Sequence, residues 1–174
     1  MYINLSDVLS EHHKPIDMNV PVEMNEFQSV LGTMPIVDKS DFYITVKHVK
    51  GRELLITGKG QVVIEIPCDR CLEPVATKFQ LDFVKNVDLS EDEVQADELD
   101  EKNYIDGYNL DVDKLLYNEI LIGWPMKILC SEDCKGICNT CGQNLNKGTC
   151  NCEDTSLDPR MSVIRDVFKN FKEV

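Results

Sequence analysis

Eight cysteines in 174 residues constrain this chain more than any other feature of its sequence. The N-terminal stretch Met1-Tyr2-Ile3 begins neither a basic region nor a continuous apolar one, and the longest apolar run, Ile120–Met126, is too short to cross a bilayer. We therefore expect a cytoplasmic protein with no membrane segment. Because disulfides persist mainly in oxidising compartments, we expect the cysteines to bind metal.

A four-thiolate zinc site is predicted from the last four cysteines, Cys138, Cys141, Cys150 and Cys152. The first two form a C-x-x-C turn, in which two sulfurs can reach one ion while backbone N–H groups bond to the sulfurs. Gly142 follows the turn, at a position that suits positive φ. The polar stretch 143–148 would bring the last two cysteines back to the turn. This pattern predicts a small zinc-knuckle module.

A second site of the same kind is predicted from the other four cysteines, Cys68, Cys71, Cys130 and Cys134. Such a site would close a long loop between the two C-terminal members and the earlier C-x-x-C pair, which is entropically costly. Structural zinc contributes about 10–16 kcal/mol in apparent binding free energy, so it can offset that cost.

Alternatives to this grouping remain open at the level of sequence. One groups Cys130, Cys134, Cys138 and Cys141, although Gly136 argues against the continuous helix that such spacing would use. Another leaves the first C-x-x-C pair without metal and puts zinc in the C-terminal four alone. Four thiolates also suit an iron–sulfur cluster.

No enzyme site is predicted. A catalytic zinc keeps an open coordination position and usually includes histidine, but the three histidines of the chain lie outside the cysteine clusters. The Cys68–Cys71 pair carries Asp69 and Glu73, which do not favour the low-pKa thiol of a redox enzyme. We expect a non-enzymatic protein with no small-molecule substrate.

Alternating apolar residues predict an antiparallel β-sheet. Residues 42–49 and 54–66 form a predicted hairpin, and residues 75–87 form a third strand. Gly58 and Gly60 inside a strand are typical of a bulge or a sharp bend, so we expect a curved sheet, with a barrel-like shape as the extreme form.

Two amphipathic helices complete a predicted α+β fold. Apolar residues recur at helical spacing from Val112 to Trp124-Pro125, and again after Asp158. The fold class is a curved antiparallel sheet with packed helices and a zinc-knuckle module. We assign residues 1–129 to the sheet domain, 130–155 to the cysteine-rich zinc module, and 156–174 to a C-terminal helix that packs on the sheet domain.

The acidity of the chain is concentrated in one region. Eleven acidic residues and one lysine lie between Asp88 and Asp113, whereas the rest of the chain has 17 basic against 20 acidic residues. Residues 88–103 have few large apolar groups and are predicted to be a flexible segment, serving solubility or docking to a basic protein. The net charge of -13 therefore leaves room for RNA contact elsewhere.

Several stretches of the sequence carry a family resemblance, namely Cys68–Val75, Cys134–Cys138, Cys141–Asn146 and Asp158–Arg160. Together they resemble the YceD family, whose members are called large ribosomal RNA subunit accumulation proteins. The resemblance implies a bacterial cytoplasmic factor, with plastid relatives, that supports accumulation of large-subunit ribosomal RNA. It implies no catalytic residue.

The leading interpretation is a zinc-stabilised factor in ribosome biogenesis. Its partner would be a ribosomal RNA precursor or a ribosomal protein, contacted by Arg70, Lys135 and Lys147. The alternative is a redox-switched zinc holdase chaperone, because some chaperones also combine C-x-C and C-x-x-C at one zinc and release it on oxidation.

Overall fold

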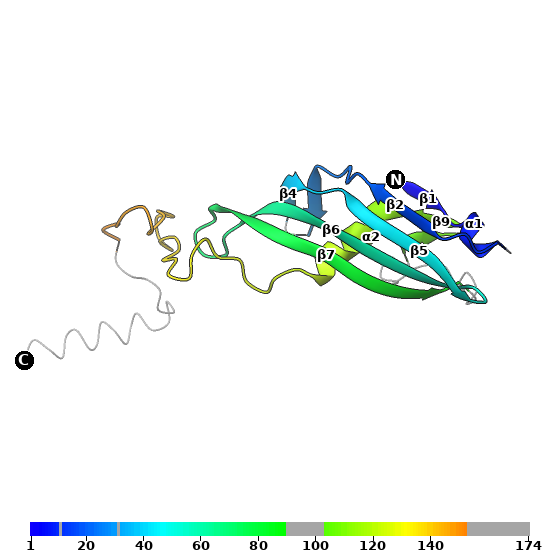
Figure 1. Ribbon diagram of the computed structural model, residues 1–174. Helices are drawn as coiled ribbons and strands as arrows, with labels where there is room; N and C mark the ends of the chain where they lie inside the picture. Colours follow the sequence, from blue (N-terminus) through cyan, green and yellow to red (C-terminus); the bar gives the residue numbers. More distant parts are fainter. Residues whose placement is uncertain (11, 31, 90–102, 153–174) are drawn as a thin grey trace, which may run out of the picture. The chain divides into compact units, whose positions relative to one another are not determined.

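The structure, a computed structural model, describes residues 1–10, 12–30, 32–89 and 103–152 (Figure 1). They form two compact units. The first unit consists of Met1–Ile66 and Ala76–Met126, and the second of Pro67–Val75 and the chain from Lys127 onward, here residues 127–152. All eight cysteines belong to the second unit.

Three long strands form the centre of the first unit, β5 (Phe42–Lys50), β6 (Glu53–Pro67) and β7 (Pro74–Asp88). Strands β5 and β6 are an antiparallel hairpin in which Val46 lies opposite Ile56, and β7 pairs with β6. The hairpin turns at Gly51, where φ is 58°. The predicted hairpin and third strand are confirmed, because their apolar residues alternate clearly between a buried and an exposed face.

Six further strands were missed by the sequence analysis. Strands β2 (Ile16–Val20), β3 (Glu26–Ser29) and β4 (Gly32–Lys39) extend the central sheet to the order β2-β5-β6-β4-β3, with β7 beside β6. A separate sheet has the order β1-β9-β8, formed by β1 (Tyr2–Asn4), β8 (Ile105–Asp106) and β9 (Asn109–Asp111). Among the described strands, β2, β3 and β7 each pair with a single neighbour in the central sheet, so the barrel-like shape is corrected to an open sheet.

Helix α2 (Val112–Ile122) packs within the first unit. Its N-cap is Asp111, whose side chain accepts hydrogen bonds from the backbone N–H groups of Asp113 and Lys114. Its apolar stripe is buried, and Phe27 of β3 stacks on Tyr117 at a centroid distance of 4.9 Å. The sequence predicted this helix and its stripe. The other helix in the described residues is the four-residue α1 (Ser6–Leu9).

Trp124, just after α2, completes the aromatic contact between helix and sheet. Its ring lies 5.4 Å from those of Phe27 and Phe79. No helix in the described part of the chain is long and apolar enough to span a membrane. Residues 90–102 of the predicted acidic segment and the predicted C-terminal helix (156–174) lie outside the described residues.

Gly58 makes room for aromatic rings instead of marking a bulge. The β5–β6 register is continuous from Tyr43 opposite Lys59 to His48 opposite Leu54, and Gly58 lies opposite Ile44 within it. A β-carbon at Gly58 would collide with the rings of Phe42 and Phe83, which stack at 5.9 Å. Of the bulge or sharp bend expected at Gly58 and Gly60, the register excludes a bulge at Gly58, and the shift in this ladder lies between His48 and Lys50.

Replacing Gly58 with valine is expected to destabilise the first unit by about 1–3 kcal/mol, because the rings of Phe42 and Phe83 would have to move. Urea unfolding followed by Trp124 fluorescence measures the change. Lys59→Ala is the matched control, since it removes only an exposed ion pair with Asp82 (Nζ–Oδ2 3.7 Å) and should cost at most about 1 kcal/mol. Equal midpoints for the two variants would contradict the explanation.

Candidate metal centres

The loop between β6 and β7 folds into a tight C-x-x-C turn. The backbone N–H of Leu72 donates to the Cys68 carbonyl at 2.9 Å, and the N–H of Cys68 donates to the Glu73 carbonyl at 2.8 Å. Leu72 takes a φ of 62°, close to the 73° of Gly142 after the second C-x-x-C turn. Cys68 and Cys71 are only 0% and 4% exposed, so the turn buries both.

The two residues between these cysteines hold the segment that carries the second pair. The backbone N–H of Ile128 donates to Asp69 Oδ2 at 2.7 Å, and Asp69 N–H donates to the Ile128 carbonyl at 2.9 Å. Arg70 Nη1 donates to the carbonyls of Glu132 (3.3 Å) and Cys134 (2.8 Å). The C-x-x-C turn therefore binds and positions the chain from Ile128 to Cys134.

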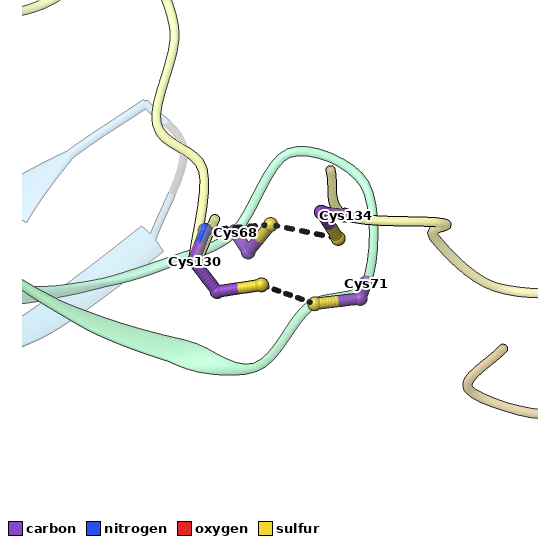
Figure 2. Close-up of side chains that lie close together, drawn as sticks. All are labelled: Cys68, Cys71, Cys130 and Cys134. Carbon is purple, nitrogen blue, oxygen red and sulfur yellow. Dashed lines mark hydrogen bonds between the residues drawn. The ribbon is translucent and has the colours of Figure 1, made fainter. Parts of the chain in front are cut away.

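The structure brings four of the cysteines together in a set that we call the first cluster, Cys68, Cys71, Cys130 and Cys134 (Figure 2). The four sulfurs lie within 4.8 Å of one another. The Sγ–Sγ distance is 3.9 Å between Cys68 and Cys134 and 3.5 Å between Cys71 and Cys130. A tetrahedral ion with metal–sulfur bonds of about 2.3 Å would set the sulfurs about 3.8 Å apart. The donor set fits such an ion.

The remaining cysteines form the second cluster, Cys138, Cys141, Cys150 and Cys152, again with sulfurs within 4.8 Å of one another. The C-x-x-C turn of this cluster is closed by the N–H of Gly142, which donates to the Cys138 carbonyl at 2.8 Å. The N–H of Thr140 donates to Cys138 Sγ at 3.4 Å. Cys141 is exposed and the others are half-buried, whereas three cysteines of the first cluster are buried. The alternative set of Cys130, Cys134, Cys138 and Cys141 is not brought together.

Each cluster contains at least one thiol whose pKa lies below its ordinary value. Burial alone would raise the pKa of Cys68, but hydrogen bonds from the backbone N–H groups of Arg70, Cys130 and Cys71 outweigh it and lower the pKa to about 6. In the second cluster, the backbone N–H groups of Cys141 and Thr140 lower the pKa of Cys138 to about 6. These donors stabilise sulfur in the thiolate form that binds metal.

Each cluster also contains a thiol that resists ionisation. The backbone N–H of Glu73 favours the Cys71 thiolate, but burial and the neighbouring thiols raise the pKa of Cys71 to about 12. The hydrogen bond with Cys141, together with burial, raises the pKa of Cys152 to about 12. Four thiolates this close repel one another, so full ionisation requires a cation among them.

Metal affinity is therefore expected to fall at least tenfold per pH unit between pH 8 and pH 6. Cys71 and Cys152, with pKa values of about 12, must each lose a proton when a cation binds, and protons compete more strongly as the pH falls. Competition against a chromophoric zinc chelator, calibrated with zinc alone at each pH, measures the affinity. A pH-independent affinity would contradict metal binding by these thiols.

The basic residues singled out from the sequence all lie in the second unit. Arg70 uses Nη1 on the two backbone carbonyls, and Lys147 Nζ lies 2.6 Å from Glu73 Oε1. This pair raises the pKa of Lys147 and lowers that of Glu73. Lys135 is exposed. Their contact with a partner stays a prediction.

Two asparagines that shape the first cluster were missed. Asn146 Nδ2 donates to Cys134 Sγ at 3.2 Å, and Asn144 Nδ2 donates to Glu73 Oε1 at 3.1 Å. The sequence indicates a connector at residues 143–148 and includes both asparagines in the family resemblance, but it assigns neither side chain a contact. No local signal indicates these contacts, because Asn144 reaches a residue 71 positions away in the chain.

Comparison with known proteins points to one family description. The family model for "Large ribosomal RNA subunit accumulation protein YceD" matches residues 56–168. A Zea mays protein named "Large ribosomal RNA subunit accumulation protein YCED homolog 1, chloroplastic" is 27% identical over 157 residues, covering 72% of this chain and 52% of that protein. The chain thus spans about half the length of this relative. No solved structure matches the chain.

Proposed function

The chain belongs to the YceD family, and from that membership we propose that it supports the accumulation of large-subunit ribosomal RNA as a zinc-stabilised, non-enzymatic factor. The resemblance seen in the cysteine motifs is confirmed by the family match, which includes all eight cysteines. The family description and the name of the maize relative both refer to large-subunit ribosomal RNA. A place in ribosome biogenesis, in the cytoplasm, follows as part of the proposal.

Zinc is the metal that the two clusters suit best, one ion in each. Both donor sets consist of cysteine alone, and the first has sulfur spacings of 3.5 and 3.9 Å. A closed four-thiolate zinc supplies folding free energy and keeps no open position for a reacting water. The single observation that supports the proposed structural, non-enzymatic role is the presence of two complete sets of four cysteines on one small unit.

The partner is a ribosomal RNA precursor or a ribosomal protein. Within the second unit the exposed Lys135 is the side chain that we propose for contact with phosphate, since Arg70 and Lys147 are engaged within the unit. Their charges would add to the local potential that an RNA backbone meets.

Depletion in the organism of origin tests the function. We expect the ratio of large-subunit to small-subunit ribosomal RNA to fall, and wild-type protein to restore it. Lys135→Glu is expected to restore it less well than Lys127→Glu, a matched reversal of another exposed lysine in the same unit. An unchanged ratio after depletion would contradict the proposal.

The greater exposure of the second cluster favours one alternative, the redox-switched holdase. Peroxide treatment separates the two functions. A holdase would release metal and then suppress aggregation of an unfolded client, whereas the ribosomal factor is expected to lose metal without gaining that activity.

A further inference from the structure

The loop that closes the second cluster is residues 143–147, between its C-x-x-C turn and its C-x-C pair. At its start, the N–H of Cys138 donates to the Gln143 carbonyl at 2.9 Å. Gln143 Nε2 donates to the Thr149 carbonyl at 3.2 Å, which ties the beginning of the loop to the residue before Cys150. The hydrogen bonds that fix this loop therefore also hold the two halves of the second cluster together.

The same loop supplies a hydrogen bond to the first cluster. Asn146 Nδ2 donates to Cys134 Sγ at 3.2 Å, while its Oδ1 accepts from the backbone N–H of Lys135 at 2.8 Å. Because Lys135 N–H is a donor, it fixes Oδ1 on its side and leaves the amide N–H group facing the sulfur. Asn146 therefore presents a donor to a buried thiolate ligand.

Further contacts hold the loop against the first cluster. The N–H of Leu145 donates to the Gly136 carbonyl at 2.9 Å, and Ile137 and Asn144 form a β-bridge. Asn144 Oδ1 accepts from the N–H of Asn146 at 2.9 Å, and its Nδ2 reaches Glu73, two residues after Cys71. This one loop thus contacts both parts of the first cluster, at Glu73 after the Cys68–Cys71 turn and at the segment around Cys134.

From this geometry we infer that Asn146 is a positioning residue that couples metal binding at the two clusters. The inference rests on the proposed metal binding. When the second cluster holds its ion, the loop is fixed and Asn146 supports the Cys134 thiolate; when that ion is absent, the loop loosens and the donor is lost. Outer-shell donors of this kind change metal affinity about 10–100-fold. Since coupling is reciprocal, an ion in the first cluster also favours binding in the second.

A double-mutant cycle on the full chain tests the coupling. Cys138→Ser/Cys141→Ser disables the second cluster, and the affinity of the first cluster is then read from Co²⁺ titration, followed by sulfur-to-cobalt absorption, and from zinc chelator competition. We expect this change to weaken the first cluster about 10–100-fold. We expect Asn146→Ala to weaken it similarly, and the combination to add little further loss.

Two further variants keep the test specific. Asn146→Asp retains the oxygen that accepts from Lys135 N–H but loses the donor, so it should weaken the first cluster at least as much as alanine does while leaving the loop in place. Lys127→Ala, which changes an exposed side chain of the same unit outside both C-x-x-C turns, should leave the first cluster unchanged.

The outcomes distinguish the two proposals. Losses that add independently, or an Asn146→Asp variant that binds as tightly as wild type, would overturn the coupling while two bound ions still support the zinc proposal. Wild-type protein that binds no metal would overturn both.

Discussion

Replacing Cys71 with serine is expected to reduce the bound metal from two ions to one and to unfold the second unit around the first cluster. The side chain is 4% exposed, and its sulfur lies 3.5 Å from that of Cys130. A serine hydroxyl is a poor substitute for a thiolate, and it would leave three thiolates around an incomplete site. Most of the binding free energy of that ion, about 10–16 kcal/mol in apparent terms for structural zinc, would be lost.

Metal analysis and trypsin digestion measure the two effects of Cys71→Ser. Cleavage after the exposed Lys127 and Lys135 should accelerate, while Trp124 fluorescence of the first unit stays native. Cys141→Ser is the matched comparison, because it removes a thiol from the second cluster instead. A Cys71→Ser variant that keeps two ions and the trypsin resistance of wild type would contradict the first cluster as a metal site.

Removing metal from the wild-type chain is expected to unfold the second unit and spare the first. Among the residues of the second unit that the structure describes, the buried ones that cluster are Cys68, Cys71 and Cys134, with Val75, Leu129 and Ile137 packed beside them. So few apolar side chains cannot offset the entropy of ordering residues 127–152. The first unit has its own core, including fully buried Phe27, Phe42 and Leu115, and contains none of the cysteines, so we expect it to stay folded without metal.

Hydrogen exchange with and without a strong chelator measures this difference. Protection should disappear in Pro67–Val75 and residues 127–152 and persist in β5 and α2. Re-addition of zinc should restore it. Loss of protection throughout both units, or in neither, would contradict the division into a metal-dependent unit and a metal-independent unit.

The sequence predicted the elements whose patterns are strong over many residues. Strand β6 alternates over 15 residues, and α2 has a cap at Asp111 and a regular apolar stripe. The early strands were not predicted because buried and exposed residues hardly alternate in them. In β2 only Val20 is buried, and in β4 only Met34. Strands β1, β8 and β9 have two or three residues each, which is too short for any pattern.

The grouping of the cysteines followed from parity and spacing, and the structure brings together the same two sets. The hydrogen bonds that surround the cysteines did not follow from parity or spacing. Asp69 was considered only for its charge, yet it binds the backbone of Ile128. Asn146 reaches Cys134 across a loop whose path only the folded chain defines. Hydrogen bonds of this kind depend on where distant segments meet, which periodicity does not encode.

The metal content of the wild-type chain, purified without added metal and measured by elemental analysis, tests the central claim most directly. We expect two zinc ions per chain, one in each set of four cysteines. Iron in their place, or a chain whose residues 127–152 remain protected with no metal bound, would contradict it.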